Sequence, residues 1–281
     1  MISCLSVFCG HCAHCTTGRP FICENPETAR APEDRPRLQQ DGHPVHQFYN
    51  LSSFAEYMLV HEHALVKIRP DMPLDRAALI GCAVTTGVGA VTNTAQVEVG
   101  ATIAVIGCGG IGLSAINGAA ISGAGRIIAI DLNDSKLDTA RTFGATDTIN
   151  AATTDPVEAI REMTGGGVAY SFEAIGRKQT TEQAFRMLAT GGTATVIGMV
   201  PEGEMVEIEA ADLINDKTLR GSNMGSNRFR VDMPNYVDFY LDGRLKLDAM
   251  IARRIGLEDV NEAFAEMKRG EFARSVITFD S

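Results

Sequence analysis

Four cysteines near the start of the chain have the residue type and spacing of a metal site. Cys9, Cys12, Cys15 and Cys23 form the pattern C-x2-C-x2-C-x7-C. The two-residue gaps let a tight turn direct successive sulfurs at one ion, and the longer gap lets the loop fold back. Four thiolates satisfy a tetrahedral zinc with no open position, so such a site is structural. The alternative is four cysteines packed as small apolar residues, but metal-type spacing favours zinc.

A glycine-rich segment later in the chain has the spacing of a nucleotide-phosphate site. The segment VIGCGGIG supplies Gly107, Gly109 and Gly112 as G-x-G-x-x-G, with Gly110 inside the motif. It follows an apolar strand pattern and opens a helix pattern, the context that makes this spacing informative. In such motifs the first glycine allows the turn, the second lets the backbone approach a pyrophosphate, and the third permits close packing. We therefore expect phosphates at the N-terminus of this helix.

An acidic residue stands where such a motif would select its dinucleotide. Asp131 ends the next predicted strand, 19 residues after Gly112, and Lys136 follows five residues later. A carboxylate at this place accepts hydrogen bonds from ribose hydroxyls and repels a 2′-phosphate, so the motif predicts NAD rather than NADP. Lys136 could reach the same ribose. The alternative is that Asp131 is a helix-capping acid; its place in the motif favours the cofactor.

Alternating strands and helices position these motifs. Helix patterns follow the strands at 110–122, 135–144, 155–167 and 179–192, and such alternation predicts a doubly wound parallel sheet. Six strands in two halves make a complete dinucleotide-binding, or Rossmann, domain. The six predicted strands are 101–107, 126–131, 146–150, 168–176, 193–200 and 218–223.

The segments on both sides of this domain have a different pattern. Helix patterns at 231–242 and 258–269, and strand patterns at 251–255 and 274–279, follow the last strand of the sheet. We expect them to join the N-terminal segment in one discontinuous domain. The predicted domains are therefore 93–224 for the dinucleotide and 1–92 with 225–281 for the second unit.

Composition narrows the class of protein. The net charge of −10 argues against nucleic acid and against anionic membrane surfaces as partners. No apolar run is expected to have the length of a membrane span. We see no signal peptide, and the odd number of cysteines, seven, argues against a disulfide framework. These observations predict a cytoplasmic protein.

Taken in order, the segments resemble the medium-chain zinc-containing alcohol dehydrogenases. The cysteine loop is followed by GC-x-x-x-TG around Cys82, the glycine motif with Asp131 and Lys136, SFEAIGR and ARSVITF. The resemblance covers residues 1–281. It implies that a GroES-like β-barrel catalytic domain accompanies the Rossmann sheet, with zinc and NAD as cofactors. An alcohol or aldehyde is the implied substrate, and a homodimer or higher homo-oligomer, paired through the edge strand at 218–224, is the implied assembly.

The resemblance also implies roles for single residues. Cys82 matches a catalytic zinc ligand, although alone it would pass for a core residue. The remaining positions match residues that contact the nicotinamide, the adenosine or the pyrophosphate, and they are Thr86, Ile111, Ile175, Arg177, Val200 and Arg274. For the two arginines the alternative is a solvated surface charge. In the family's chemistry, zinc polarises the alcohol oxygen while hydride passes to the nicotinamide.

One part of the family pattern has no match. The other catalytic ligands, in a Cys-Gly-Thr/Ser-Asp-like segment and a Gly-His-Glu, precede the cysteine loop in the family. The expectation is therefore an N-terminally truncated member with an incomplete barrel and poor activity. His61 and His63 are not expected to substitute as ligands, although they, with His43 and His46, would be reconsidered if the chain were active. Two alternatives are a non-catalytic NAD-binding or assembly subunit and a zinc-free quinone-reductase relative; the cysteine loop and Cys82 count against the latter.

Overall fold

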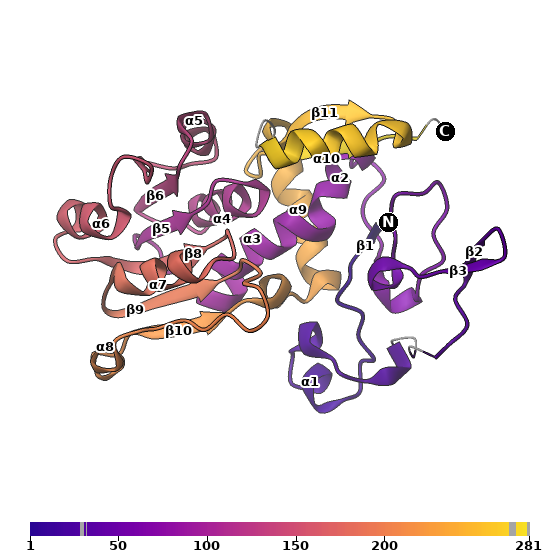
Figure 1. Ribbon diagram of the computed structural model, residues 1–281, viewed down its shortest axis with the longest axis horizontal. Coiled ribbons are helices and arrows are strands. Elements are labelled where there is room, and N and C mark those ends of the chain that lie inside the picture. The colour runs from indigo at the N-terminus through magenta and orange to yellow at the C-terminus, as the bar shows by residue number, and fades with distance from the viewer. Residues whose placement is uncertain (29–30, 32, 270–273, 280–281) are drawn as a thin grey trace. The chain divides into compact units, whose positions relative to one another are not determined.

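The computed structural model describes residues 1–28, 31, 33–269 and 274–279. The chain forms two compact units, and each is built from separate stretches of sequence (Figure 1). The first unit contains 1–82, 227–241 and 247–281, and the second contains 83–226 and 242–246. The second unit thus begins ten residues before the predicted boundary at 93. Close packing explains this, because a Cβ added to Gly87 would lie 2.4 Å from the backbone oxygen of Ile111.

The second unit is built on one parallel sheet of six strands, as predicted. The strand order is β10-β9-β8-β5-β6-β7, and all of the pairings are parallel. Crossover helices connect the strands, which makes this the Rossmann fold. The strands are β5 (Thr102–Ile106), β6 (Arg126–Asp131), β7 (Asp147–Asn150), β8 (Val168–Glu173), β9 (Leu188–Val196) and β10 (Thr218–Gly221). The helices are α3 (Thr85–Gly89), α4 (Gly110–Ile121), α5 (Asp134–Thr142), α6 (Pro156–Thr164), α7 (Lys178–Arg186) and α8 (Ala210–Ile214).

Apolar strand residues explain why this sheet forms. Ile103 to Ile106 and Ile127 to Ile130 are at most 2% exposed, as expected for strands covered on both faces. Helix boundaries follow local chemistry. The side chain of Asp155 accepts hydrogen bonds from the N–H groups of Val157 and Glu158 at the start of α6, and Gly165 ends it at φ +72°.

One predicted helix is too long. The pattern at 179–192 predicts a continuous helix, but α7 ends at Arg186 and β9 begins at Leu188. Leu188 pairs with Val168, and the register then shifts so that Thr193 pairs with Tyr170. Because Met187 and Leu188 are at most 1% exposed, burial in the core of the sheet overrides the helical pattern here.

A long apolar helical run leads into the second unit. It comprises α2 (Leu74–Leu79), the π-helical turn η5 (Ile80–Val84), α3 and a second π-helical turn, η6 (Ala90–Ala95). Its 22 residues are long and apolar enough to cross a membrane, so the expectation that no run has this length is wrong. The protein buries 67% of the most apolar window. A core helix has the same composition, so the run is weak support for a membrane span.

In the residues of the first unit that the structure describes, there are three small two-stranded sheets. Strand β1 (Ile2–Ser3) pairs with β4 (Leu65–Val66), β2 (Leu38–Gln40) with β3 (His43–Val45), and β11 (Ile251–Ile255) with β12 (Arg274–Ile277). The predicted strands at 251–255 and 274–279 are confirmed, as are the helices α9 (Phe229–Leu241) and α10 (Val260–Arg269). Residues 24–50 are not wholly irregular as predicted, because a tight turn at Asp41 and Gly42, both with positive φ, forms the β2–β3 hairpin.

An ion pair connects two neighbouring strands of the parallel sheet. Arg126, at the start of β6, donates from Nε and Nη2 to the two carboxylate oxygens of Asp147, at the start of β7, over 2.9 and 2.8 Å. Its Nη1 also donates to the backbone oxygen of Met163, near the end of α6, over 2.7 Å. These contacts, chiefly the hydrogen bonds from Arg126, lower the pKa of Asp147 to about 2. One guanidinium thus joins two strands and a helix.

We predict that Arg126→Met lowers the free energy of unfolding by about 1–3 kcal/mol at pH 7. Since the pKa of folded Asp147 lies below the ordinary 3.8, the pair's contribution is complete above that pH and is lost as pH falls through about 2. Urea denaturation at pH 7 and at low pH measures both effects. Arg244→Met, which removes an arginine exposed in its pair with Asp242, is the control. Equal effects of both substitutions would contradict the prediction.

Candidate zinc and dinucleotide sites

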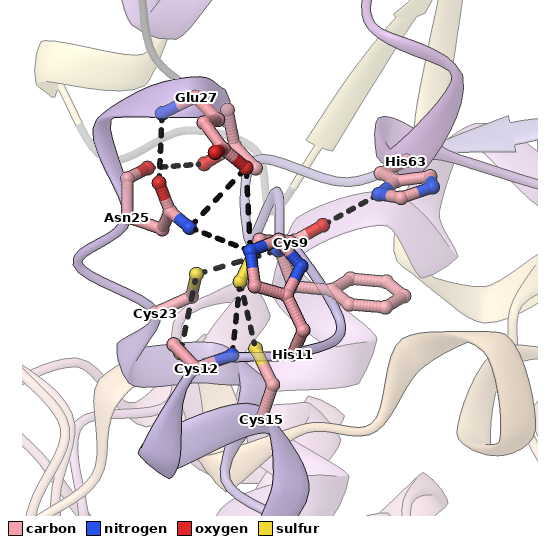
Figure 2. A network of polar contacts seen from close by, with 10 residues as sticks. Cys9, His11, Cys12, Cys15, Cys23, Asn25, Glu27 and His63 are labelled. Carbon is pink, nitrogen blue, oxygen red and sulfur yellow. Dashed lines mark hydrogen bonds and ion pairs between the residues drawn. The ribbon is translucent and has the colours of Figure 1, made fainter.

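The four predicted cysteine ligands lie together in the loop that leaves β1. The short helix α1 (Ala13–Thr16) begins directly after Cys12, and the 3-10 helix η1 (Pro20–Ile22) ends directly before Cys23. The sulfurs of Cys9 and Cys15 are 3.9 Å apart, as are those of Cys12 and Cys23. All four sulfurs lie within 4.8 Å of one another, and Figure 2 shows them converging. The chain therefore brings these side chains together without a bridging disulfide.

This geometry fits a zinc ion. Zinc–sulfur bonds of about 2.3 Å in a tetrahedron separate the sulfurs by roughly 3.8 Å, close to the observed spacing of the two nearest pairs. Two backbone N–H groups point at the same sulfurs, from Cys12 to Cys9 over 3.3 Å and from Cys9 to Cys23 over 3.4 Å. Such donors stabilise thiolates, which are the form of cysteine that binds metal.

The thiols of this loop differ in acidity. Burial opposes ionisation of Cys9, but backbone hydrogen bonds from His11 and Cys12, with a side-chain hydrogen bond from Asn25, lower the pKa of its thiol to about 6. Burial and the neighbouring thiols raise the pKa of Cys15 to about 12. The loop thus favours a thiolate at one corner, and further ionisation needs a cation among the sulfurs.

Side chains outside the ligand set hold the loop in place. The amide nitrogen of Asn25 lies 3.1 Å from Nε2 of His11, and the amide oxygen accepts from the N–H of Glu27 over 2.9 Å. On the other side, Nδ1 of His63 lies 2.7 Å from the backbone oxygen of Phe8, next to Cys9 (Figure 2). His63 therefore contacts the loop backbone through its ring, whereas His11 is largely exposed.

Cys82 lies apart from this loop. It is exposed in η5, and it belongs to no group of three or more His, Cys, Asp or Glu ligands in the part of the chain that the structure describes. His61 accepts a hydrogen bond at Nδ1 from the N–H of His63. The described residues around Cys82 therefore do not fit a complete zinc site, and its role as a ligand stays a prediction.

The glycine motif joins β5 to α4 by a very tight turn. Gly107 has φ +97°, and a Cβ on Gly112 would lie 1.7 Å from the backbone oxygen of Gly107. Only glycine fits at Gly112, because any side chain would overlap that carbonyl. Gly109 differs, since a Cβ there would meet no atom within 4 Å. The open space beside Gly109, at the N-terminus of a 12-residue helix, is where a phosphate would lie.

The carboxylate of Asp131 is tied to this turn. Its Oδ2 accepts from the N–H of Cys108 over 2.8 Å, and its Oδ1 accepts from the N–H of Asn133 over 3.1 Å. The side chain of Asn133, not of Asp131, caps α5, so the capping alternative for Asp131 is wrong. Lys136 is half-buried in the first turn of α5. Asp131 is thus fixed at the end of β6, beside the glycine motif.

The other predicted cofactor residues occupy several elements. Ile175 is 43% exposed and Arg177 is exposed just before α7, whereas Ile111 in α4 and Val200 after β9 are half-buried. Thr86, in α3, is buried, and its hydroxyl donates to the sulfur of Met224 over 3.4 Å. Arg274 lies in β12 of the first unit. The roles of these residues at the cofactor stay predictions.

Two features of the second unit were missed from the sequence. Glu173 is fully buried at the end of β8, and its signal was an acidic residue inside the apolar run VAYSFEAIG. Met224, Gly225 and Ser226 are all left-handed, with φ of +47°, +68° and +46°. Three successive residues in this conformation are rare. Their only sequence signal was the glycine.

Comparisons with known proteins place the chain among zinc-binding dehydrogenases. The family described as zinc-binding dehydrogenase matches residues 110–242. Alcohol dehydrogenase 1 of Pisum sativum is 35% identical over 280 residues, which are 97% of this chain and 74% of that protein.

Solved structures agree with this placement. An alcohol dehydrogenase zinc-binding domain protein from Burkholderia ambifaria is 34% identical with a TM-score of 0.91, and the match covers 98% of this chain and 76% of that one. Benzyl alcohol dehydrogenase from Acinetobacter calcoaceticus is 31% identical with a TM-score of 0.87, covering 97% and 75%. The chain therefore spans about three quarters of the length of the proteins it matches.

We predict that the purified chain holds about one tightly bound zinc, on the four-cysteine loop, because this loop alone among the described residues brings four thiolates together. Cys12→Ser should release most of the zinc and lower the melting temperature. Cys82→Ser, which leaves the loop unchanged, should keep it. Metal analysis after dialysis measures the stoichiometry. Two retained zinc ions, one of them lost in Cys82→Ser, would contradict the prediction.

Proposed function

The chain belongs to the medium-chain zinc-containing alcohol dehydrogenases, and we propose that its glycine motif and Asp131 bind NAD for this chemistry. Enzymes of this family oxidise an alcohol to an aldehyde or ketone, with zinc and NAD(H) as cofactors. The observation that carries the proposal is the turn between β5 and α4. Open space beside Gly109 faces a helix N-terminus, and the Asp131 carboxylate is held within hydrogen-bond distance of the same turn.

We propose that different residues of the second unit contact different parts of the bound NAD. The N–H groups at the start of α4 bind the pyrophosphate, as helix N-termini bind anions. Asp131 accepts hydrogen bonds from the adenosine ribose, with Lys136 beside it. Ile175 and Arg177 line the adenosine. Ile111 and Val200 line the nicotinamide, and the Thr86 hydroxyl lies beside it. The role of Arg274 at the pyrophosphate stays a prediction from the family resemblance. Hydride acceptance is supplied by the bound NAD.

The two proposed metal roles have unequal support. The four sulfurs of the cysteine loop are spaced for a closed zinc site, which would hold the loop together and leave no position for a substrate. A catalytic zinc needs about three protein ligands and an open position. Among the residues that the structure describes, Cys82 supplies one such thiolate, which is too few ligands for a catalytic zinc.

The substrate is proposed to be a small alcohol or the corresponding aldehyde. The solved relative from Acinetobacter calcoaceticus is a benzyl alcohol dehydrogenase, so aromatic alcohols are the first class to test. We also propose a homodimer or higher homo-oligomer. Strand β10 is an outer strand of the sheet, and a strand at this place can pair with the same edge of a second chain. A cytoplasmic location is proposed because all seven cysteines are free thiols.

We predict that the chain binds NAD at least about tenfold more tightly than NADP, because Asp131 would face a 2′-phosphate. Asp131→Gly should remove most of this preference and weaken binding of NAD. Isothermal titration with both dinucleotides measures it. Asp134→Asn is the control, since Asp134 is exposed three residues later and its Oδ1 accepts a hydrogen bond from the side-chain amide of Asn150. A wild type that prefers NADP would show that Asp131 does not read the ribose.

Alcohol oxidation by the 281-residue chain alone is expected to be slow, even with added zinc. The physical reason is that the described residues offer one thiolate, Cys82, for a metal that needs three ligands. Formation of NADH from ethanol and from benzyl alcohol measures the rate, with Cys82→Ser as the paired variant. We expect similar, low rates in both. Rapid oxidation that Cys82→Ser abolishes would show that further ligands complete the site.

A further inference from the structure

A fully buried carboxylate lies at the carboxyl end of β8, beside the dinucleotide turn. Glu173 is 0% exposed, and no Lys, Arg or His among the described residues forms an ion pair with it. One of its oxygens, Oε1, accepts three hydrogen bonds: from the N–H of Ile175 over 2.9 Å, from the N–H of Gly176 over 2.8 Å, and from the hydroxyl of Thr180 over 2.8 Å. Oε1 of Glu173 thus holds the turn between β8 and α7 by three hydrogen bonds.

The second oxygen of Glu173 has no hydrogen-bond partner among the residues that the structure describes. Oε2 is buried, and a Cβ added to Gly198 would lie 2.5 Å from it, so this oxygen is enclosed by backbone. A buried polar atom without a partner is destabilising, because it has lost its hydrogen bonds to water without replacing them. Such a cost at a fully buried position indicates that the acidic side chain acts through its other oxygen.

The turn that Glu173 holds bears directly on the glycine motif. Ala174 donates from its N–H to the backbone oxygen of Ile106, the last residue of β5, over 2.9 Å. A Cβ on Gly107 would lie 2.7 Å from Cγ1 of Ile175, so this isoleucine packs on the first glycine of the motif. Gly176 turns the chain at φ +88°. The position of residues 174–177 therefore determines which side chains lie beside the turn between β5 and α4.

We infer that Glu173 is a positioning residue for the adenosine half of the cofactor. Its Oε1 fixes residues 174–177, and this turn in consequence holds Ile175 against Gly107 and presents Arg177 at the start of α7. Glu173 does not touch the cofactor, because it is fully buried. The inference rests on the proposed function, since it requires a dinucleotide at the glycine motif.

Binding of AMP and of NAD to the full chain, measured by calorimetry, tests this role. Glu173→Ala should weaken AMP binding by about tenfold or more, because the loss of three hydrogen bonds frees the turn. Glu173→Gln keeps an acceptor oxygen for the three donors and should bind AMP within about threefold of wild type. Thr180→Val removes one donor and should give a smaller loss, about threefold, even if Glu173→Ala does not fold.

Ser171→Ala is the matched control on the same strand. The Ser171 hydroxyl is buried and donates to the backbone oxygen of Ala184 over 2.6 Å, away from the turn. This variant should lower the melting temperature without changing AMP affinity, which separates positioning from general stability.

The outcomes separate the two proposals. If the wild type binds neither AMP nor NAD, the proposed function fails. If the wild type binds both while Thr180→Val and a folded Glu173→Ala bind AMP equally well, the inference about Glu173 is overturned. A loss in Glu173→Gln as large as in Glu173→Ala would also overturn it, because the negative charge, not the hydrogen-bonded turn, would then govern binding.

Discussion

The dinucleotide unit depends on a backbone contact that leaves no room for a side chain. The carbonyl oxygen of Gly107 lies where a Cβ of residue 112 would stand, 1.7 Å away, so α4 can begin directly against the end of β5. This contact directs the first N–H groups of the helix toward the space beside Gly109. Asp131 reaches the same turn from the neighbouring strand, and Ile175 packs on it from the turn that follows β8. The neighbours of β5 on both sides are thus arranged around one turn.

The first unit is stabilised by different interactions from those of the second. Its sheets have two strands each, and isolated two-stranded sheets are marginally stable in water. Hydrogen bonds and ion pairs between side chains add to the stability of this unit. Asp75 receives hydrogen bonds from Arg76 and from Arg254, which connects α2 to β11. His63 anchors the start of the cysteine loop through the backbone oxygen of Phe8. Zinc on the four cysteines would add a cross-link of the same kind, since metal binding to such loops contributes directly to folding.

Two local departures from good packing lie in the second unit. Among the described residues Oε2 of the buried Glu173 has no hydrogen-bond partner, and Met224 to Ser226 form a left-handed turn that L-residues disfavour. The second feature contacts the helix that carries Thr86, because the hydroxyl of Thr86 donates to the Met224 sulfur and Gly225 packs on Gly89. Both lie next to residues proposed to contact the cofactor, where structural cost is more often tolerated.

Local sequence rules were sufficient for the parallel sheet, the glycine turn and the cysteine loop, because each depends on spacing within a few residues or on simple apolar periodicity. The family came from the resemblance of the segments taken in order along the chain. The β2–β3 hairpin was also within reach, since Asp-Gly between two short strands is a recognised turn signal. Tertiary structure alone decided the rest. The end of α7 depends on the burial of Met187 and Leu188, the start of the second unit on packing between α3 and α4, and the three donors of Glu173 on where β8 meets α7. These depend on contacts between segments far apart in the chain, or on burial that no local pattern records. The four cysteines lie close together in sequence, so their spacing predicted that they converge. Cys82 needs partners from elsewhere in the chain, so its own segment could not show whether it binds a metal.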